Sequence, residues 1–538
     1  MTLKHIFKSN GQTLWRSRAH SVWFRLCAVC LSVYLSYITY FAHSGFLKST
    51  GESIAALVCF VLLCVLVYLI LDIGTLRLCR FAPKPGKQRE KADQRVFALA
   101  FVLAMGIFGC TFAACYPGGV NYDVSNQWHQ VHSGEFNNWH PLFHTLLIWL
   151  VTRVHDSYSF GVLVQIVIFS ALMARLTATL HKHGVPAWLA LIVHAVTAAS
   201  LSVRNTLMYL GKDSVMTMGV LVLTAQAAEM LFTKGEWLKK PLHAASMGLA
   251  LGFVALTRIN ALLWCIPFVL CAFFAWKPVR KSAALAVCVM IAFMAIIQGP
   301  VYGALDVVYP SNTVEEAVGL PMTVLCDIRP REMDKLDEET MAFLATLAPN
   351  EAWQNTYTLH SYNSIKFTYE RELIKHTPLA DILSMSARSA LAAPRTAFEA
   401  VNGLTDIVWD ITGNDEGYRH VRNSGDIPEL QFKSEKLNRL GSLASKVFEW
   451  PMELLPLRWL TRNIGVQMLL LLLATLWALR RRGCDVLILA LPTLLYNLGT
   501  MLLLCGNDAR FFHFSMTASL AAILPLLYLP KEDEQACR

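Results

Sequence analysis

The residue best suited to chemistry in this chain is an acid placed at the end of an apolar segment. Asp123 follows the turn Tyr116-Pro117-Gly118-Gly119, which comes directly after such a segment, so the height of its carboxylate above the segment is fixed. A carboxylate in this position could act as the general base for a hydroxyl nucleophile. The alternative is a carboxylate that only caps a turn or a helix, and the loop alone does not distinguish the two.

Three cationic residues at similar segment ends could hold an anionic group. They occur in the runs Lys212-Asp213, Arg258-Ile259-Asn260 and Asn507-Asp508-Ala509-Arg510. Arg suits bidentate recognition of a phosphate, and Lys acts as a point charge. The alternatives are pairing within the protein, for example of Arg510 with Asp508, and snorkelling at a helix end. The sequence therefore predicts Lys212, Arg258 and Arg510 as phosphate-binding residues.

Polar and aromatic residues near these positions are candidates for substrate binding. They are Tyr116, Gln127, Trp139, His140, Asp213 and Asn260. Aromatic residues at segment ends are typical of the belt that lies at a membrane interface. Stacking on a sugar is the alternative for Trp128 or Trp139.

A cluster of histidines raises the question of a metal site. His129, His132, His140 and His144 fall within one short stretch, and the last two are one helical turn apart, so they could share a metal. No HExxH motif accompanies them. We therefore assign no metal ligand and expect no cofactor, and a divalent metal remains an alternative.

The composition identifies the elements that must position these residues. The chain has 538 residues, of which 55% are hydrophobic and only 16% charged, and its mean hydropathy is +0.43. The apolar residues gather in blocks of about 17 to 22, the length of a membrane-spanning helix. These values exclude a disordered chain and a conventional soluble enzyme. The sequence predicts an all-α polytopic membrane protein.

Twelve spans are expected, and the basic loops set their orientation. The spans are 22–42, 53–73, 96–115, 158–179, 186–203, 213–232, 242–257, 259–276, 282–300, 463–479, 484–504 and 511–529. The first is read as a retained helix, because it is long for a signal peptide and lacks a clear cleavage site. The positive-inside rule then places both termini in the cytoplasm. The apolar stretch 140–154 is too short to span, and we expect a juxtamembrane or re-entrant helix there.

Three regions follow from this topology. Residues 1–300 form an N-terminal membrane domain with the candidate catalytic loop 116–157. Residues 301–462 form a helical extracytoplasmic segment with 16 Lys and Arg against 23 Asp and Glu, and residues 463–538 add the last spans and a short tail. Within the segment, Asp337 is expected to cap a helix, and Pro378 and Pro394 to start two more. The run 413–417 is expected to be a turn, with a calcium or substrate loop as the alternative.

Several classes of partner are disfavoured. The net charge of +9 comes from short basic loops, so nucleic-acid binding is not expected. The cysteines lie mainly inside apolar blocks, and neither a disulfide framework nor a zinc ribbon follows from their spacing. No GxxxxGK[ST] motif is present, which leaves an ATP-driven pump unsupported. No cytoplasmic loop is large enough for a nucleotide-sugar domain, so the donor of any transferred sugar should be lipid-linked.

The set of outer-loop residues resembles the GT-C superfamily of membrane glycosyltransferases. The stretch from Tyr116-Pro117-Gly118 through Asp123 and Gln127 to His140-Pro141-Leu142 is similar to the superfamily's first outer loop, in which an acid precedes a His-Pro element. Lys212-Asp213, Arg258-Ile259-Asn260, Gly319-Leu320-Pro321 and Asn363-Ser364-Ile365-Lys366 look like a little-characterised bacterial branch. The resemblance covers about residues 96–510.

The resemblance implies an inverting transfer of a sugar from a polyprenyl-phosphate carrier to an envelope glycan, glycolipid or protein outside the plasma membrane. Asp123 would deprotonate the acceptor, and Lys212, Arg258 and Arg510 would stabilise the leaving phosphate. Many members carry two adjacent acids, whereas the next acid after Asp123 is Glu135, which argues against a metal-bridged site. The alternatives are a lipid or polysaccharide transporter and a metal-dependent envelope hydrolase or transferase built on the histidines.

Overall fold

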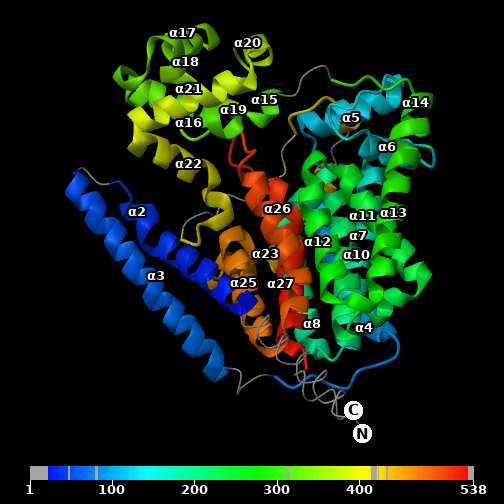
Figure 1. Cartoon of the computed structure of the whole chain (residues 1–538). Helices are drawn as coiled ribbons and strands as arrows, with labels where there is room; N and C mark the ends of the chain where they lie inside the picture. The colour runs from blue at the N-terminus through cyan, green and yellow to red at the C-terminus, as the bar shows by residue number, and fades with distance from the viewer. Residues whose placement is uncertain are drawn as a thin grey trace.

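The computed structural model describes residues 22–46, 49–78, 83–310, 314–412, 421, 423–431 and 434–530. Within these ranges every regular element is a helix, and strand-like pairing is limited to isolated bridges such as that between Gly119 and Tyr209. The predicted all-α class is confirmed. Figure 1 shows a bundle of long helices with a group of shorter helices beyond one end of it.

Among the described residues, eight helices are long and apolar enough to cross a membrane. They are Val22–Ser44, α3 (Thr50–Leu78), α4 (Gln94–Ala114), α7 (Tyr158–Lys182), α10 (Lys212–Phe232), Lys277–Ala304 with α13 (Arg280–Ile296) inside it, α25 (Ile464–Arg481), and Ala509–Tyr528 with α27 (His513–Tyr528) inside it. The number of candidate spans is nine if a bent pair of helices is counted as one more span. A polytopic membrane protein is therefore supported, but the predicted count of twelve spans is not reached.

The remaining four predicted spans are short or interrupted. The stretch 186–203 forms α8 (Ala187–Ala199) and α9 (Leu201–Leu207), which are bent by 62° to each other. The stretches 242–257 and 259–276 form α11 (Pro241–Thr257) and a 3-10 turn leading into α12 (Leu262–Ala275), with Arg258 extended between them. The stretch 484–504 splits into a 3-10 helix, Cys484–Leu489, and α26 (Leu491–Met501), because Pro492 favours a new helix start.

The loop after α4 holds two helices. The expected short helix is α6 (Leu142–Thr152), whose 11 residues extend about 16 Å, roughly half the thickness of a bilayer core. Before it lies α5 (Tyr122–Ser133), a helix that the sequence analysis did not anticipate. Both lie at the same end of the bundle in Figure 1.

Burial separates the centre of the bundle from its edges. Within the most apolar window of α10, 89% of the residues are buried, against 11% for α3 and 6% for Lys277–Ala304. Figure 1 shows α3 and α13 at opposite edges, with α7 and α10 in between. Exposed helices that are apolar on all sides are typical of lipid-facing membrane spans, and α3 and α13 have this character at the edges of the bundle. The lysine that begins α10 is therefore carried by the most enclosed helix.

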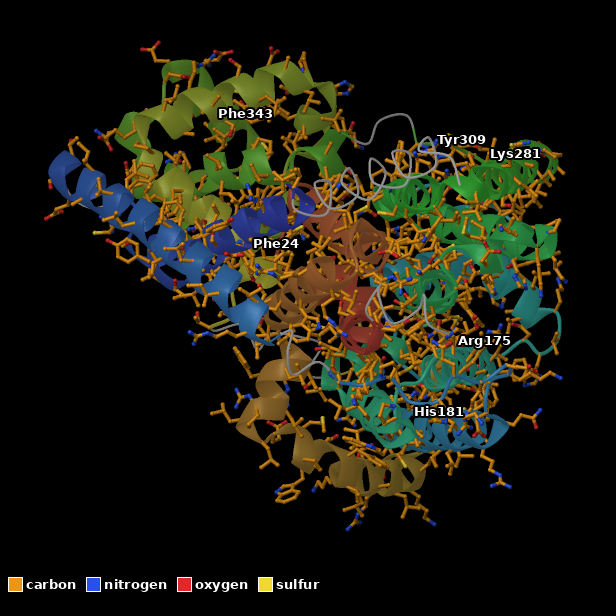
Figure 2. The ribbon with its side chains drawn as sticks, turned by 60° about the horizontal axis from the view of Figure 1, so that its bottom comes forward. Phe24, Arg175, His181, Lys281, Tyr309 and Phe343 are labelled. Atoms are coloured by element: carbon orange, nitrogen blue, oxygen red, sulfur yellow. The ribbon has the colours of Figure 1, made fainter. Side chains whose placement is uncertain are left out.

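A second group of helices has its own core. It comprises α15 (Val314–Ala317), α16 (Gly319–Arg331), α17 (Glu338–Leu347), α18 (Asn350–Asn355), α19 (Asn363–Lys366), α20 (Arg371–His376), α21 (Leu379–Ala392) and α22 (Pro394–Trp409). Met322, Leu344 and Trp353 are buried in this core. In Figure 2, Phe343 of α17 lies far across the molecule from His181, in the last turn of α7. We call residues 314–412 the outer helical layer.

The predicted helix starts in this layer are confirmed. Asp337 caps α17 by accepting the backbone N–H of Thr340 at 2.8 Å. Pro378 precedes α21, and Pro394 is the first residue of α22. The expected turn at 413–417 lies outside the described residues.

The end of the predicted segment 301–462 packs differently. Helices α23 (Glu435–Met452) and α24 (Leu455–Arg462) lie against α4, α8 and α9. Gly441 of α23 is so close to the backbone of Ala113 and Ala114 that a Cβ atom would not fit. Arg204 of α9, whose side chain is 2% exposed, pairs with Glu449 at 2.9 Å. This part of the segment belongs to the helix bundle rather than to the outer helical layer.

Candidate functional site

The loop after α4 positions Asp123 through its backbone. Gly118 has a φ of +130°, a conformation that side-chain-bearing residues rarely adopt, and a Cβ on Gly119 would lie 2.5 Å from Val421. Asn121 caps α5 by accepting the N–H of Val124 at 3.0 Å. Because Asn121 supplies the cap, the carboxylate of Asp123 in the first turn is left for other partners. The structure therefore disfavours the reading of Asp123 as the capping carboxylate.

Asp123 is the centre of a cluster built from four separate segments. Its Oδ2 atom accepts hydrogen bonds from Lys212 Nζ at 3.0 Å and from Arg510 Nη1 at 3.1 Å. His140 Nε2 lies 3.7 Å from Asp123 Oδ1, and His140 Nδ1 lies 3.0 Å from Lys212 Nζ. Four of the residues predicted from the sequence are thus brought together. Their side chains are between 12% and 23% exposed, so the cluster is half-buried yet open to a ligand.

The charges around Asp123 control its ionisation. Burial alone would raise the pKa of the Asp123 carboxyl, but the opposite charges of Lys212 and Arg510 outweigh it and hold that pKa well below its usual range. Burial, followed by the charge of Lys212, lowers the pKa of His140 to about 4. His140 is therefore neutral at pH 7. Its Nδ1 accepts from the Lys212 ammonium, which leaves the proton on Nε2, facing Asp123.

A second ion pair lies next to this cluster. Arg258, between α11 and α12, pairs with Asp213 in the first turn of α10. The guanidinium carbons of Arg258 and Arg510 lie 4.8 Å and 5.2 Å from the centre of the Phe511 ring. Arg510 also keeps the partner expected from sequence, because its Nε lies 2.8 Å from Asp508 Oδ2. Arg510 is thus paired with Asp508 and also lies next to Asp123.

The other predicted binding residues have different roles. Gln127 is buried and bonds Thr145 Oγ1 and His144 Nδ1, both at 3.0 Å, so it joins α5 to α6. Asn260 bonds Thr500 Oγ1 at 2.8 Å and ties the turn before α12 to α26. Neither is placed by these bonds to touch a ligand at Asp123.

The aromatic candidates contact residues outside the cluster. Tyr116 packs edge-on against Phe112, and the N–H of Trp139 is bonded by the side chain of Asn137. Among the described residues, no hydrogen bond or ion pair links either of them to Asp123. Trp128, the other candidate for sugar stacking, is 6% exposed and packs against Tyr158, which indicates a core residue.

Three of the four histidines bond different partners. His132 bonds Asp156 at 2.9 Å, His140 belongs to the charged cluster, and His144 bonds Gln127. Within the described ranges, no group of three or more His, Cys, Asp or Glu side chains is placed to hold a metal ion. The arrangement offers three cations, each paired with a carboxylate, and Asp123 is the carboxylate that two of the cations share, which suits proton transfer beside an anionic ligand.

Three residues near the site were missed as contributors in the sequence analysis. Phe511 lies between the two arginines, Asn423 Oδ1 accepts the N–H of Val120 at 3.1 Å, and Glu429 caps α7 through the N–H groups of Tyr158 and Ser159. Phe511 follows Arg510 directly, which is a local signal. Asn423 and Glu429 are about 300 residues from their partners, and no local pattern marks them.

An apolar cavity opens beside the charged cluster. Its volume is about 550 Å³, and its wall comes from α6, α7, α10 and α11. The lining is almost wholly apolar and includes Ile148, Val215 and Ala250. Asp123, His140, Lys212 and Arg510 do not line the cavity, but His144 does, and the charges of Lys212 and His140 act on the His144 ring. A ligand with an anionic head and a long apolar tail would satisfy both regions.

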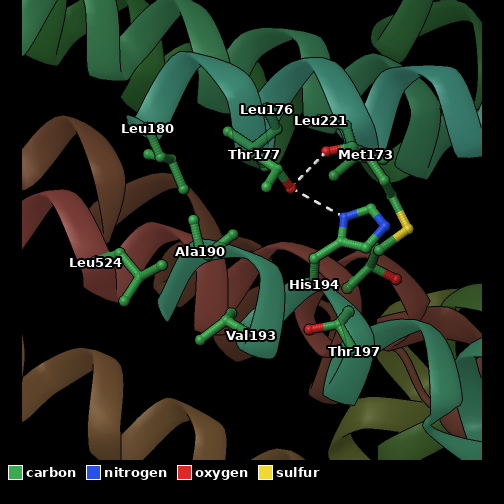
Figure 3. A pocket seen from close by; sticks show the side chains of 12 residues that line it. Met173, Leu176, Thr177, Leu180, Ala190, Val193, His194, Thr197, Leu221 and Leu524 are labelled. Carbon is green, nitrogen blue, oxygen red and sulfur yellow. Dashed lines mark hydrogen bonds between the residues drawn. The ribbon is translucent and has the colours of Figure 1, made fainter. Parts of the chain in front are cut away.

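A much smaller cavity lies deeper in the bundle. Its volume is about 10 Å³, enough for one water molecule. Figure 3 shows His194 at its edge, with Nδ1 bonded to Thr177 Oγ1 at 2.9 Å, while Thr177 donates to the carbonyl of Met173. This space is too small for a substrate, so the candidate site remains the cluster at Asp123.

Comparisons with protein-family models, with curated proteins and with solved structures found no match for this chain.

Proposed function

We propose that this protein is an integral membrane glycosyltransferase of the GT-C type, which moves a sugar from a polyprenyl-phosphate carrier to an acceptor of the cell envelope. The observation that carries the proposal is the meeting of Asp123, Lys212 and Arg510 next to a large apolar cavity. A carboxylate held between two cations offers a base and an anion site at one place. A membrane cavity beside them matches a donor whose phosphate carries a lipid.

The proposed reaction uses these groups in a defined order. The donor phosphate binds Lys212 and Arg510, both of which donate a hydrogen bond to Asp123 Oδ2 in the structure. Once the phosphate takes part of their charge, the pKa of Asp123 rises and its carboxylate becomes a better base. Asp123 then accepts the proton of the acceptor hydroxyl, whose oxygen attacks the anomeric carbon while the carbon–phosphate oxygen bond breaks. Attack from the face opposite the phosphate inverts the anomeric centre.

The neighbouring residues support this geometry. Neutral His140 accepts a hydrogen bond from Lys212 and directs its own N–H toward Asp123. The Arg258–Asp213 pair adds a second guanidinium, and both guanidinium groups contact the Phe511 ring. Preorganised cations at the point where charge develops on the leaving group stabilise the transition state. Tyr116 and Trp139 remain candidates for contacts with the sugar.

The location follows from the charge at the two ends of the bundle. Asp123 lies at the end where α4 finishes, whereas Lys182 and Arg480 lie at the far ends of α7 and α25. Basic residues favour the cytoplasmic side. We therefore place the site on the outer face of the plasma membrane, with both termini in the cytoplasm. The acceptor would be an envelope glycan, glycolipid or protein.

The test is transfer of radiolabelled sugar from polyprenyl-phosphate donors into membrane acceptors. Asp123→Asn should abolish transfer in a normally folded protein, while Asp156→Asn, a matched change in the same loop at an exposed residue, should leave it intact. Equal transfer in wild type and Asp123→Asn would remove Asp123 from the mechanism. Absence of transfer with every donor would reject the enzyme.

A lipid or polysaccharide transporter is the second candidate, and one observation favours it. The α8–α9 pair is bent by 62° and carries the fully enclosed Arg204 just after the bend. Broken helices with charged residues line the substrate path in many transporters. Movement of labelled lipid across vesicles without any sugar transfer would support this function over the transferase.

A further inference from the structure

The loop that carries Arg510 is held by the outer helical layer. The carbonyl of Cys505 accepts the N–H of Asn363 at 2.9 Å, next to α19. Gly506 fits against Ser361 and Asn363 so closely that a Cβ would lie within 3 Å of both side chains. Two consecutive residues of the loop are thus fixed by one short stretch of the outer helical layer.

The next residue of the loop is fixed by another helix. Asn507 Nδ2 donates a hydrogen bond of 2.6 Å to Asp406 Oδ1 on α22. Asp508 follows; its carboxylate accepts from the backbone N–H of Arg510 at 3.0 Å and forms an ion pair with the Arg510 guanidinium, with Oδ2 lying 2.8 Å from Nε. Arg510 then reaches Asp123. The contacts therefore run without a gap from α22 to the proposed base.

The anchor in the outer helical layer is itself rigid. Asp327 of α16 is fully buried, and its carboxylate accepts from Tyr357 and from both the backbone N–H and Nδ1 of His360, at 2.9 and 2.6 Å. His360 has a φ of +61°, a conformation that persists only where its surroundings impose it. A buried carboxylate with several donors holds the chain between Tyr357 and Asn363 in one conformation.

We propose that Asn507 and Asp406 are positioning residues, and that their bond holds Arg510 in place beside Asp123 so that the outer helical layer determines how tightly the site binds an anionic headgroup. Neither residue touches the donor in the proposed reaction. The identity of the anion as a lipid phosphate rests on the proposed function, whereas the placement of Arg510 does not.

The first measurement follows the position of Arg510 without any ligand. The ring of His140 faces Asp123, Lys212, Arg510 and Arg258, and its neighbour His144 lies beyond. Titration of the protein labelled at histidine carbons, with the signal assigned through His140→Gln, reports the pKa of His140. Asn507→Ala should raise this pKa toward its ordinary value, because the charge of Arg510 moves away. Asp406→Asn keeps an acceptor oxygen for Asn507 and should titrate as the wild type does.

The second measurement is binding of a polyprenyl monophosphate in detergent micelles. Loss of a hydrogen bond to a charged group is expected to weaken binding about tenfold in Asn507→Ala and in Asp406→Ala. In an Arg510→Gln background, Asn507→Ala should not weaken lipid binding further, because Asn507 acts on binding through Arg510. Asn355→Ala, an exposed asparagine at the end of α18, is the matched control.

The outcomes separate the two proposals. An unchanged His140 titration in Asn507→Ala would overturn the positioning role, whether or not the lipid binds. A wild type that binds no polyprenyl monophosphate would overturn the proposed donor, while a raised His140 pKa in Asn507→Ala would still support positioning. An equal loss of binding in Asn507→Ala with and without Arg510 would show that Asn507 acts through another route, and would also reject the inference.

Discussion

Replacement of Arg510 by glutamine should move the pH dependence of the reaction in a calculable direction. In the proposed reaction Asp123 acts as a base only when it is deprotonated, so activity should be present above the pKa of Asp123 and be lost as the pH falls through that pKa. In the wild type the adjacent cations hold this pKa well below its usual range, so the acid limb of kcat/KM lies at very low pH. Removal of one cation raises the pKa of Asp123, and the limb moves to higher pH.

The size of the change follows from the geometry. At 3.1 Å and an effective dielectric constant of about 20, the Arg510–Asp123 pair is worth about 5 kcal/mol at most. Both side chains are roughly one-fifth exposed, and solvent screening reduces this by about half. Since one pH unit corresponds to about 1.4 kcal/mol, the acid limb should move upward by about two pH units. The change falls within the usual effect of one opposite charge on a carboxylate.

The assay is kcat/KM for sugar transfer across the acidic range, because this ratio reports the ionisation of the free enzyme. Arg395→Gln on α22, an exposed arginine paired with Glu399, is the matched control and should keep the wild-type profile. A lower plateau with an unmoved limb in Arg510→Gln would mean that Arg510 binds the donor but does not control the base. The assignment of Asp123 as the titrating base would then be refuted.

Three further predictions address the cavity, the aromatic ring and the fold. Ala250→Trp should fill the apolar cavity and reduce transfer from a long-chain donor more than transfer from a short-chain analogue. The control Ala284→Trp, on the exposed face of α13, should reduce transfer from neither donor. An equal loss of transfer with both donors in Ala250→Trp would exclude the cavity as the lipid site. Phe511→Ala removes the ring that Arg258 and Arg510 both contact. Because a cation–π contact is worth about 1 kcal/mol, the KM for the donor should rise about three- to tenfold with little change in kcat. A fall in kcat alone would contradict this prediction. Glu449→Ala leaves the buried Arg204 without its carboxylate and should lower the stability of the protein by about 2 to 3 kcal/mol. Thermal unfolding in detergent measures this loss, and an unchanged Tm would contradict it.

Local signals in the sequence were read correctly where their cause is local. The cap at Asp337 and the proline starts of α21 and α22 depend on a few adjacent residues, and the structure has them as expected. The apolar blocks predicted membrane helices for the same reason. Interruptions such as the bend at Ser200 depend on tertiary packing, where Ser200 Oγ bonds the carbonyl of Thr461, and the predicted count of twelve spans is not supported.

In the site, too, local features could be predicted from the sequence and long-range contacts could not. Residue type and position at a segment end selected Asp123, His140, Lys212 and Arg510, which do meet. Their meeting could not be derived, because 89 residues separate Asp123 from Lys212 and 387 separate it from Arg510. Gln127 was chosen for its polarity within the same loop. It lies one helical turn beyond Asp123, about 6 Å along α5, and there it faces α6 instead of the cluster.

The pairing of three cations with three carboxylates has a consequence for the whole catalytic cycle. Lys212, Arg258 and Arg510 are matched by Asp123, Asp213 and Asp508, so the empty site has almost no net charge. In the proposed reaction a sugar phosphodiester would enter with one negative charge, and the phosphate that leaves can carry nearly two at neutral pH. The proton that Asp123 takes from the acceptor removes one negative charge from the protein at the same step. The total charge of protein and ligand together therefore stays constant during transfer. Asp123 must lose that proton, to the departing phosphate or to water, before the next turnover, so in the proposed cycle recovery of the base, rather than bond cleavage, should be the step that responds to the pH on the side that the site faces.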